Sequence, residues 1–394
     1  MQNLLSINKK RDLIKSQDNP TMTDPRQRAW IEVDSAAIET NTSILKGLIA
    51  ENCLFMAVVK ADGYGHGATN VAHAALRGGA QYLGIATLQE GLELRKSGLT
   101  CPVLVLGNLT KAEELKICLE WNLTPTISSI KEAIICEEIA EKSKLRYPIH
   151  LKVDTGMTRL GCDLDEALNL INQIDDLKHV ILKGVYSHLA LADQKSSTAT
   201  YKQKKKFDDL IRSLKTQNKS FCYHIANSAA TLIDDTLHYN MVRVGLAIYG
   251  YSPIKDLQNH LNLKPALTVK ARVTLIRKVP NGVGVSYGHS FITKRTSRLA
   301  VVAIGYADGI NRALSGKISP LINGRSIPQV GAITMDQLVM DVTDHPEVQV
   351  GNVVTLLGAD GNNCITPQQW CHWSGSIPWE VLCGFKDRLP RIVI

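Results

Sequence analysis

The chain has 394 residues, 44% of them hydrophobic and 21% charged, which is ordinary for a globular protein with room for two domains. No apolar run approaches the ~18 residues of a membrane helix, so we expect no membrane association. Nine scattered cysteines without a Cys-x-x-Cys pair favour a reduced, cytoplasmic protein over disulfides or a metal site, and we predict no metal.

The formal net charge is +8, and basic residues gather in two places. Residues 1–28 hold six Lys or Arg against three Asp and lack the apolar core of a signal peptide. We expect a disordered basic tail there, with Met22 as a candidate for the true start. The second cluster, residues 202–206, is interrupted by Gln203 and has helical character. A solvated helix face explains it better than nucleic acid, so we expect no nucleic acid partner.

Ordered sequence begins with an alternating strand at 29–34 and a helix from Ser35. Short apolar strands then alternate with longer amphipathic helices, which is typical of a parallel α/β layout. The strands that we predict lie near 54–60, 82–86, 102–106, 123–127, 148–154, 182–187, 221–225 and 242–247. Eight such units predict a (β/α)8 TIM barrel over residues 29–262, with an open doubly wound sheet as the alternative.

The pattern changes after residue 262. Alternating segments separated by glycines and prolines occur at 267–276, 299–304, 326–330, 338–342 and 353–357. They predict a mainly β C-terminal domain over residues 263–394. One short helix is expected with Thr366 as its cap and Pro367 in its first turn.

Lys60 ends an apolar run and is followed by a glycine-rich stretch, residues 61–67. At the C-terminal tip of a buried strand, a lysine is partly desolvated, which lowers its pKa and makes it a better nucleophile toward a carbonyl. Taken alone, a lysine that reaches from a strand end into solvent is the simpler interpretation.

Other polar residues follow the remaining strands, and in a barrel these ends share one mouth. They are Lys152, Asp154, Arg159, His188, Asn227, Ser228 and Arg243. Ser228 at a helix start and a backbone exposed at Gly245 suit a phosphate group. Separately, Asn227 and Ser228 have an alternative interpretation as a helix cap, and His188 as an interior histidine.

A lysine nucleophile beside a phosphate site indicates a phosphorylated aldehyde held as a Schiff base, and pyridoxal 5'-phosphate is the obvious candidate. Arg243 fits as the partner of its ring nitrogen. An arginine donates a hydrogen bond but keeps its proton, so the cofactor becomes a weaker electron sink. Such a site suits removal and return of a proton more than transamination.

Seven stretches resemble, in the same order, the alanine racemase family over residues 29–394. They are AVVKADGYGHG (57–67), KVDTGMTRLG (152–161), HIANS (224–228), RVG (243–245), VSYG (285–288), IGYADG (304–309) and MDQ (335–337). The resemblance implies interconversion of L- and D-alanine, which supplies D-alanine for peptidoglycan. Lys60 would carry the cofactor and act as the base on one face of the substrate Cα.

The resemblance also implies a second base, Tyr287, on the opposite face, because inversion needs a proton donor on the side that the proton did not leave. In the family this tyrosine comes from the partner subunit, so a head-to-tail homodimer with shared active sites is implied. The implied cofactor-binding residues, besides Lys60, are Tyr64, His188, Asn227, Ser228, Arg243, Gly245 and Leu246. The implied substrate-binding residues are Arg159, Met335 and Tyr306, with Lys152 as a lysine that carbon dioxide can carbamylate.

The chain departs from the family pattern in three places. Residues 384–391 lack a tyrosine that adds a phosphate contact in some members, and Thr334 stands where many relatives have cysteine. The tail before Ala29 has no counterpart in the family pattern. Three alternatives stay open: a serine or broad-specificity racemase of the same family, a non-catalytic carrier of pyridoxal phosphate on the same barrel, and a catalytically silent barrel.

Overall fold

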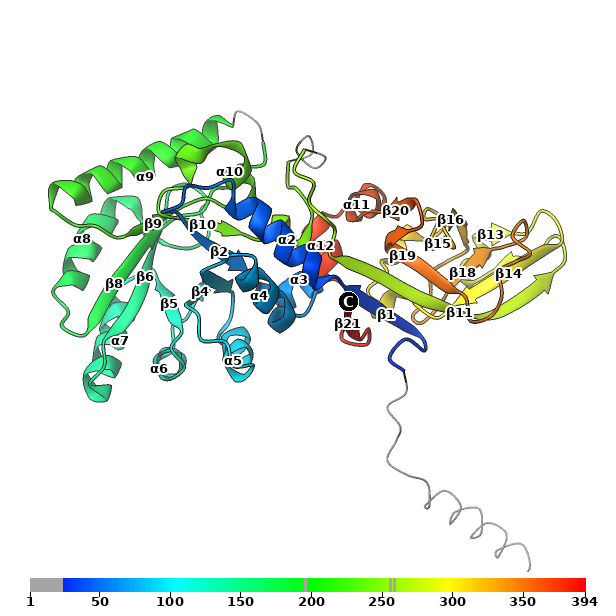
Figure 1. The fold of residues 1–394 in the computed structure, drawn as a ribbon, viewed down its shortest axis with the longest axis horizontal. Helices are drawn as coiled ribbons and strands as arrows, with labels where there is room; N and C mark the ends of the chain where they lie inside the picture. The colour runs from blue at the N-terminus through cyan, green and yellow to red at the C-terminus, as the bar shows by residue number, and fades with distance from the viewer. Residues whose placement is uncertain (1–23, 195–196, 255–256, 258–259) are drawn as a thin grey trace, which may run out of the picture. The chain divides into compact units, whose positions relative to one another are not determined.

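The computed structural model describes residues 24–194, 197–254, 257 and 260–394, so most of the expected basic tail, including Met22, lies outside the described residues. The chain divides into two compact units, and Figure 1 shows their elements. The barrel unit comprises Ile31–Thr268, Ile365–Lys386 and Arg391–Ile394, and the β unit comprises the described residues up to Trp30, Val269–Cys364 and Asp387–Pro390. Residues 365–386, which the sequence assigned to the β domain, thus belong to the compact unit of the barrel.

Eight parallel strands in the described ranges form the centre of the barrel unit. They are β2 (Leu54–Val58), β3 (Tyr82–Ile85), β4 (Val103–Asn108), β5 (Thr124–Ile127), β6 (Tyr147–Asp154), β8 (Val180–Tyr186), β9 (Cys222–His224) and β10 (Met241–Val244). Their order in space is β10-β2-β3-β4-β5-β6-β8-β9, so these eight follow one another around a circle without a reversal. A doubly wound sheet needs such a reversal, and this order excludes it.

The circle closes between β9 and β10. The Asn240 amide donates to the carbonyl oxygen of Tyr223 (3.0 Å), and the Arg243 amide donates to that of Ala226 (3.0 Å). The predicted barrel is therefore confirmed, and the C-terminal ends of the eight strands meet at one mouth.

Helices join the strands and cover the outside of the barrel (Figure 1). They are α2 (Ser35–Lys46), α4 (Ala68–Arg77), α5 (Leu88–Lys96), α6 (Ala112–Glu120), α7 (Ile130–Ser143), α8 (Leu164–Asp175), α9 (Thr198–Thr216) and α10 (Ser228–Ile233). A buried cluster of Met56, Leu104 and Met241 joins three of the strands. Within the described ranges, we find no helix whose length and apolar character would let it cross a membrane.

The turn after β2 differs from the expected strand tip. β2 ends at Val58, and the next turn, α3 (Lys60–Gly65), winds left-handed, with φ of 52° to 59° and ψ of 41° to 53° at residues 61–64. Each non-glycine residue in this region costs roughly 1 kcal/mol or more. Lys60 therefore opens a strained turn instead of ending a strand, because the chain must reverse directly behind it.

Side chains from neighbouring elements hold this turn. The Glu90 carboxylate accepts from the amides of Ala61 (2.7 Å) and Ala86 (2.6 Å). The Asp62 carboxylate accepts from the amide of Ala68 at the start of α4 (2.8 Å). These charged hydrogen bonds are of the stronger kind and offset the cost of the backbone conformation.

The β unit is antiparallel, which confirms the predicted mainly β C-terminal part. Its main strands are β11 (Leu267–Val279), β14 (Ser297–Val302), β15 (Leu321–Ile322), β16 (Arg325–Ser326), β17 (Gln329–Val330), β18 (Leu338–Asp341) and β19 (Val353–Asp360), in the order β16-β15-β19-β11-β14-β18-β17. The shorter elements of the C-terminal region are β12 (Gly284–Val285), β13 (Phe291–Ile292), β20 (Asn363–Ile365), α11 (Pro367–Ser374), α12 (Pro378–Cys383) and β21 (Arg391–Val393).

Two details of these elements bear on the predictions. The strand predicted at 326–330 is split into β16 and β17, because Pro328 between them has no amide proton to donate to a ladder. Thr366 caps α11 by accepting from the Gln369 amide, and Pro367 lies in the first turn, as predicted.

A buried carboxylate anchors the start of the described chain in the β unit. The Arg28 guanidinium donates to both oxygens of Asp308 (2.9 and 2.7 Å), and the Asp308 side chain has no exposed surface. Asp308 also accepts from the Gly305 amide (3.0 Å). The pair thus fixes residues 305–308 with a bidentate, charge-assisted contact.

We expect Arg28→Ala to lower the free energy of unfolding by about 2 kcal/mol, because it leaves Asp308 buried with one cation fewer. The matched control is Arg26→Ala, whose exposed ion pair with Asp24 (4.0 Å) is worth less than about 0.5 kcal/mol. Urea midpoints at unchanged m-value measure both. Equal shifts of the urea midpoint in the two variants would show that the buried contact with Asp308 adds no more stability than an exposed ion pair.

Candidate active site

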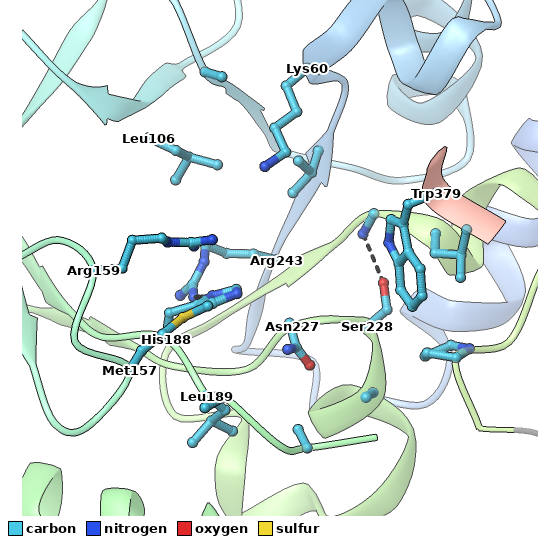
Figure 2. Close-up of a pocket in the computed structure, with 18 of the residues that line it drawn as sticks. Lys60, Leu106, Met157, Arg159, His188, Leu189, Asn227, Ser228, Arg243 and Trp379 are labelled. Atoms are coloured by element: carbon cyan, nitrogen blue, oxygen red, sulfur yellow. Dashed lines mark hydrogen bonds between the residues drawn. The ribbon is translucent and has the colours of Figure 1, made fainter. Parts of the chain in front are cut away.

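A cavity of about 690 Å³ lies at the C-terminal mouth of the barrel. In Figure 2, Lys60 points into it toward Arg243, Arg159 and His188, while Ser228 lies beside Trp379 on another side. The predicted site residues that line it are Lys60, Tyr64, Lys152, Arg159, His188, Asn227, Ser228, Arg243, Gly245 and Leu246. Residues that are up to 186 positions apart in the sequence thus meet in one cavity of the barrel unit.

Lys60 enters the cavity from the left-handed turn. Burial, and next the nearby Arg159 guanidinium, lower the pKa of Lys60 below its ordinary value. A larger fraction of the amine is then neutral near pH 7, which is the form that attacks a carbonyl or accepts a proton. Lys60 therefore points into the cavity and does not simply reach from a strand end into solvent.

Hydroxyl and amide groups converge at the part of the cavity next to α10. The Gly245 amide donates to the Ser228 hydroxyl oxygen (2.9 Å), which leaves the Ser228 proton available for an acceptor in the cavity. Tyr64 approaches the same point, since a Cβ on Gly245 would lie 2.5 Å from its hydroxyl oxygen. Asn227 caps α10 through its side-chain oxygen, which accepts from the Ala230 amide (3.0 Å). The arrangement suits an anion at a helix start.

Arg243 lies on β10, next to β2, and is 4% exposed. Its guanidinium donates to the Ser187 carbonyl oxygen (2.8 Å), to His224 Nδ1 (2.9 Å) and to His188 Nδ1 (3.1 Å). Burial, followed by the charge of Arg243, holds the pKa of both histidines well below 6.5, so both are neutral acceptors. Neutral acceptors thus hold the Arg243 guanidinium in place without neutralising its charge.

A chain of hydrogen bonds runs from Arg243 through His224 into the barrel interior. Since His224 accepts at Nδ1, its proton is on Nε2, which donates to His150 Nδ1 (3.0 Å). The Tyr186 ring stacks on His224 with centroids 4.6 Å apart, and its hydroxyl bonds Thr126 Oγ1 (2.7 Å). This chain holds the Arg243 side chain in one orientation. Sequence reasoning did not include His150 or Tyr186, whose alternation in apolar strands resembles ordinary core.

Lys152 shares the cavity with three other cations. Burial, then Arg243, Arg159 and Lys60, lower the pKa of Lys152 to about 7. Its Nζ lies 4.6 Å from the centroid of the Tyr186 ring. Asp154 raises this pKa, but its effect is the smallest of the five causes and does not offset the cations. Asp154, two residues on, instead accepts from the Gly156 and Met157 amides (2.8 and 2.9 Å) and closes a turn.

Three further residues of the cavity come from α12 and the residue that precedes it: Ile377, Trp379 and Cys383. The helix packs on the left-handed turn, where the Leu382 carbonyl leaves no room for a Cβ on Gly65. No motif in the sequence marked these residues, because they depend on a contact between segments that are more than 300 positions apart.

The other predicted site residues, Tyr287, Tyr306 and Met335, lie in the β unit. Their side chains are 74%, 41% and 53% exposed. The loops of Tyr306 and Met335 are adjacent, since the Ala307 amide donates to the Met335 carbonyl oxygen (3.0 Å). These three large side chains are therefore exposed on the surface of the β unit.

A (β/α)8 barrel that gathers a lysine of lowered pKa, a buried arginine and an anion cradle at one mouth defines a barrel enzyme that binds a phosphorylated carbonyl compound. Comparison with known proteins gives the family. The family model described as "Alanine racemase, N-terminal domain" matches residues 33–253, and "Alanine racemase, C-terminal domain" matches residues 266–393. The chain belongs to the alanine racemase family, whose members are isomerases that depend on pyridoxal phosphate.

Individual relatives agree with this. The alanine racemase of Prochlorococcus marinus is 61% identical over 375 residues, covering 94% of this chain and 97% of the relative. A Bacillus anthracis alanine racemase structure with bound L-Ala-P has a TM-score of 0.87 at 35% identity, covering 93% of this chain and 95% of that one. A Bartonella henselae alanine racemase structure with covalently bound pyridoxal phosphate has a TM-score of 0.82 at 31% identity, covering 93% and 99%.

The residues present fit this cofactor. The Ser228 hydroxyl, the Tyr64 hydroxyl and the backbone at Gly245 form a cradle that a Cβ on Gly245 would fill. Lys60 supplies an amine and Arg243 a donor, both in the same cavity as this cradle. A phosphate, an aldehyde and a ring nitrogen each have a matching partner.

We expect Ser228→Ala to weaken binding of pyridoxal phosphate to the cofactor-free protein about 10-fold, because one hydrogen bond to a charged group is lost. Asn227 still caps α10 in this variant, so the fold is kept. Pyridoxal, which lacks the phosphate, is the control ligand and should bind within twofold of wild type. Fluorescence titration measures both, and equal weakening of the two ligands would contradict a phosphate cradle at Ser228.

Proposed function

We propose that the protein interconverts L- and D-alanine with pyridoxal phosphate held at Lys60. The observation that carries the proposal is the single cavity in which Lys60, Arg243 and the cradle at Ser228 and Gly245 meet. The structures with bound pyridoxal phosphate and L-Ala-P belong to family members with the same fold and support it.

Each residue of the cavity then has a task. Lys60 would hold the cofactor through Nζ and would be the base on one face of the substrate Cα. Tyr64, Asn227, Ser228, Gly245 and Leu246 surround the phosphate, and Arg159 binds the substrate carboxylate. Pyridoxal phosphate, when bound, withdraws electrons from the Cα and so acidifies its proton.

Arg243 and His188 keep the reaction to proton transfer. Since the guanidinium stays protonated, it donates to the ring nitrogen without passing a proton to it. Neutral His188 accepts from Arg243 and adds no further charge beside the cofactor. The electron pair left at the Cα is stabilised only moderately, which favours prompt reprotonation over transamination.

Tyr287 is the proposed second base. Its 74% exposure in one chain fits a side chain that works against another surface, and Tyr306 and Met335 would complete the substrate pocket in the same way. We therefore propose a head-to-tail homodimer in which each β unit serves the barrel of its partner. The product would be D-alanine for peptidoglycan, made in the cytoplasm, where the nine cysteines, all within the described ranges, would persist as the free thiols that they are here.

The test is a chiral assay with the L-forms of alanine, serine and lysine. We expect alanine to have the highest kcat/KM and both alanine enantiomers to react. A substituent added to a methyl group changes specificity by only ~1–3 kcal/mol, so serine is the competitor to watch. A colourless protein, without cofactor trapped on Lys60 by borohydride, would support a silent barrel; a coloured one that racemises nothing would support a carrier.

We expect Tyr287→Phe to abolish racemisation from L-alanine while the cofactor stays bound, since the phenol proton is lost. Mixed with Lys60→Ala, which is also inactive, it should regain about a quarter of wild-type activity, because half of randomly formed dimers hold one intact site. Native mass spectrometry, which separates dimers by the masses of their subunits, checks the exchange of subunits. Hybrid dimers without activity would contradict shared sites.

Lys152 has a proposed role as a carbamate that positions Arg159. Its ammonium form would lose one proton, and the neutral amine would then attack the carbon of carbon dioxide and release a second proton, so that a buried cation becomes an anion. We expect a 13C carbamate resonance from labelled bicarbonate in wild type and its loss in Lys152→Ala. The same resonance in both proteins would rule out Lys152 as the site.

A further inference from the structure

Gln203 is a buried amide in an exposed basic helix. It interrupts the lysine run at residues 202–206 and is 4% exposed, whereas Lys202, Lys205 and Lys206 are exposed. Two lysines of the run pair with aspartates four residues on, which is the behaviour of a solvated helix face. A buried amide is costly unless hydrogen bonds satisfy it, so its partners indicate its task.

The Gln203 side chain bonds two separate loops at the mouth of the barrel. Its Nε2 donates to the Thr155 hydroxyl oxygen (3.2 Å), directly after β6, and to the His188 carbonyl oxygen (2.9 Å), shortly after β8. Its Oε1 accepts from the Ala190 amide (2.9 Å). Thr155 and Ser187 share a further hydrogen bond (2.8 Å). One amide thus ties the two loops to α9 and to each other.

Both loops carry residues of the cavity. The first, residues 155–161, contains Arg159, and the second, residues 188–190, contains His188 (Figure 2). Thr158, next to Arg159, has φ 56°, a conformation that persists for a non-glycine residue only where its surroundings hold it. The hydrogen bond at Thr155 is one of the contacts that can hold this loop.

We propose that Gln203 is a positioning residue, which fixes the 155–161 loop against the 188–190 loop and thereby sets Arg159 for the substrate carboxylate. The proposal rests on the proposed function, in which Arg159 binds that carboxylate. Gln203 itself is not among the residues that line the cavity and acts through the loops. A role limited to docking α9 on the barrel would affect stability but not the way substrate is bound.

The test compares holoenzyme variants Gln203→Met, which keeps the length but not the amide, and Lys206→Met on the exposed side of the same helix. We expect Gln203→Met to lower kcat/KM for alanine between about 10- and 100-fold, chiefly through KM. Affinity for pyridoxal phosphate should stay within twofold, because the phosphate cradle lies on other elements. Lys206→Met should match wild type in kcat/KM, in KM and in affinity for pyridoxal phosphate.

A second comparison shows whether the effect passes through Arg159. In an Arg159→Lys background, Gln203→Met should lower kcat/KM by less than about twofold, since the effects of substitutions within one hydrogen-bond network are not additive. The proposal would be overturned if the effects of the two substitutions on kcat/KM were fully additive. A lower melting temperature of Gln203→Met with unchanged kcat and KM would also overturn it.

Hydrogen exchange separates this result from a failure of the proposed function. Peptides that span residues 155–161 and 188–190 should exchange faster in Gln203→Met than in wild type, while residues 227–230 should not change. This measurement needs no substrate. If wild type does not racemise alanine, the proposed function fails, and unchanged exchange in both loops would overturn the role of Gln203 independently.

Discussion

The left-handed turn behind Lys60 is the constraint on which the site depends. A right-handed turn at residues 61–64 would direct Lys60 and Tyr64 differently, and both must reach the same cavity. The strained backbone is stable because Glu90 and Asp62 satisfy its amides and those next to it with charged acceptors. The cost of the conformation is thus offset by groups outside the turn, as is common where a site demands an unusual backbone.

Arg243 sets the electrostatic character of the same cavity. Lys60, Lys152 and Arg159 line the same cavity. Burial, followed by the neighbouring cations, lowers the pKa of Lys60 and Lys152, while the histidines that accept from Arg243 stay neutral. A carboxylate beside Arg243 would have neutralised it and raised the pKa of both lysines. The neutral acceptors instead leave a positive, largely buried cavity, which suits a ligand that brings a phosphate and a carboxylate.

The barrel arranges these groups through two kinds of connection. Lys60, Arg243 and Ser228 are fixed by strands and helix starts, which the parallel ladder and the cap at Asn227 hold in place. Arg159 and His188 lie on loops, where the position is set by side-chain contacts such as those of Asp154 and Gln203. Loop residues therefore need supporting residues that are distant in the sequence.

Much of this was visible in the sequence. The alternation of apolar strands with helices predicted the barrel because it reports which faces are buried, and polar residues after strands marked the mouth because parallel strands end together. The left-handed turn, the cavity wall from α12 and the roles of His150 and Gln203 were not visible. Tertiary structure alone decided them, since they depend on contacts between segments far apart in the chain, whereas local periodicity records only which side of an element faces the core.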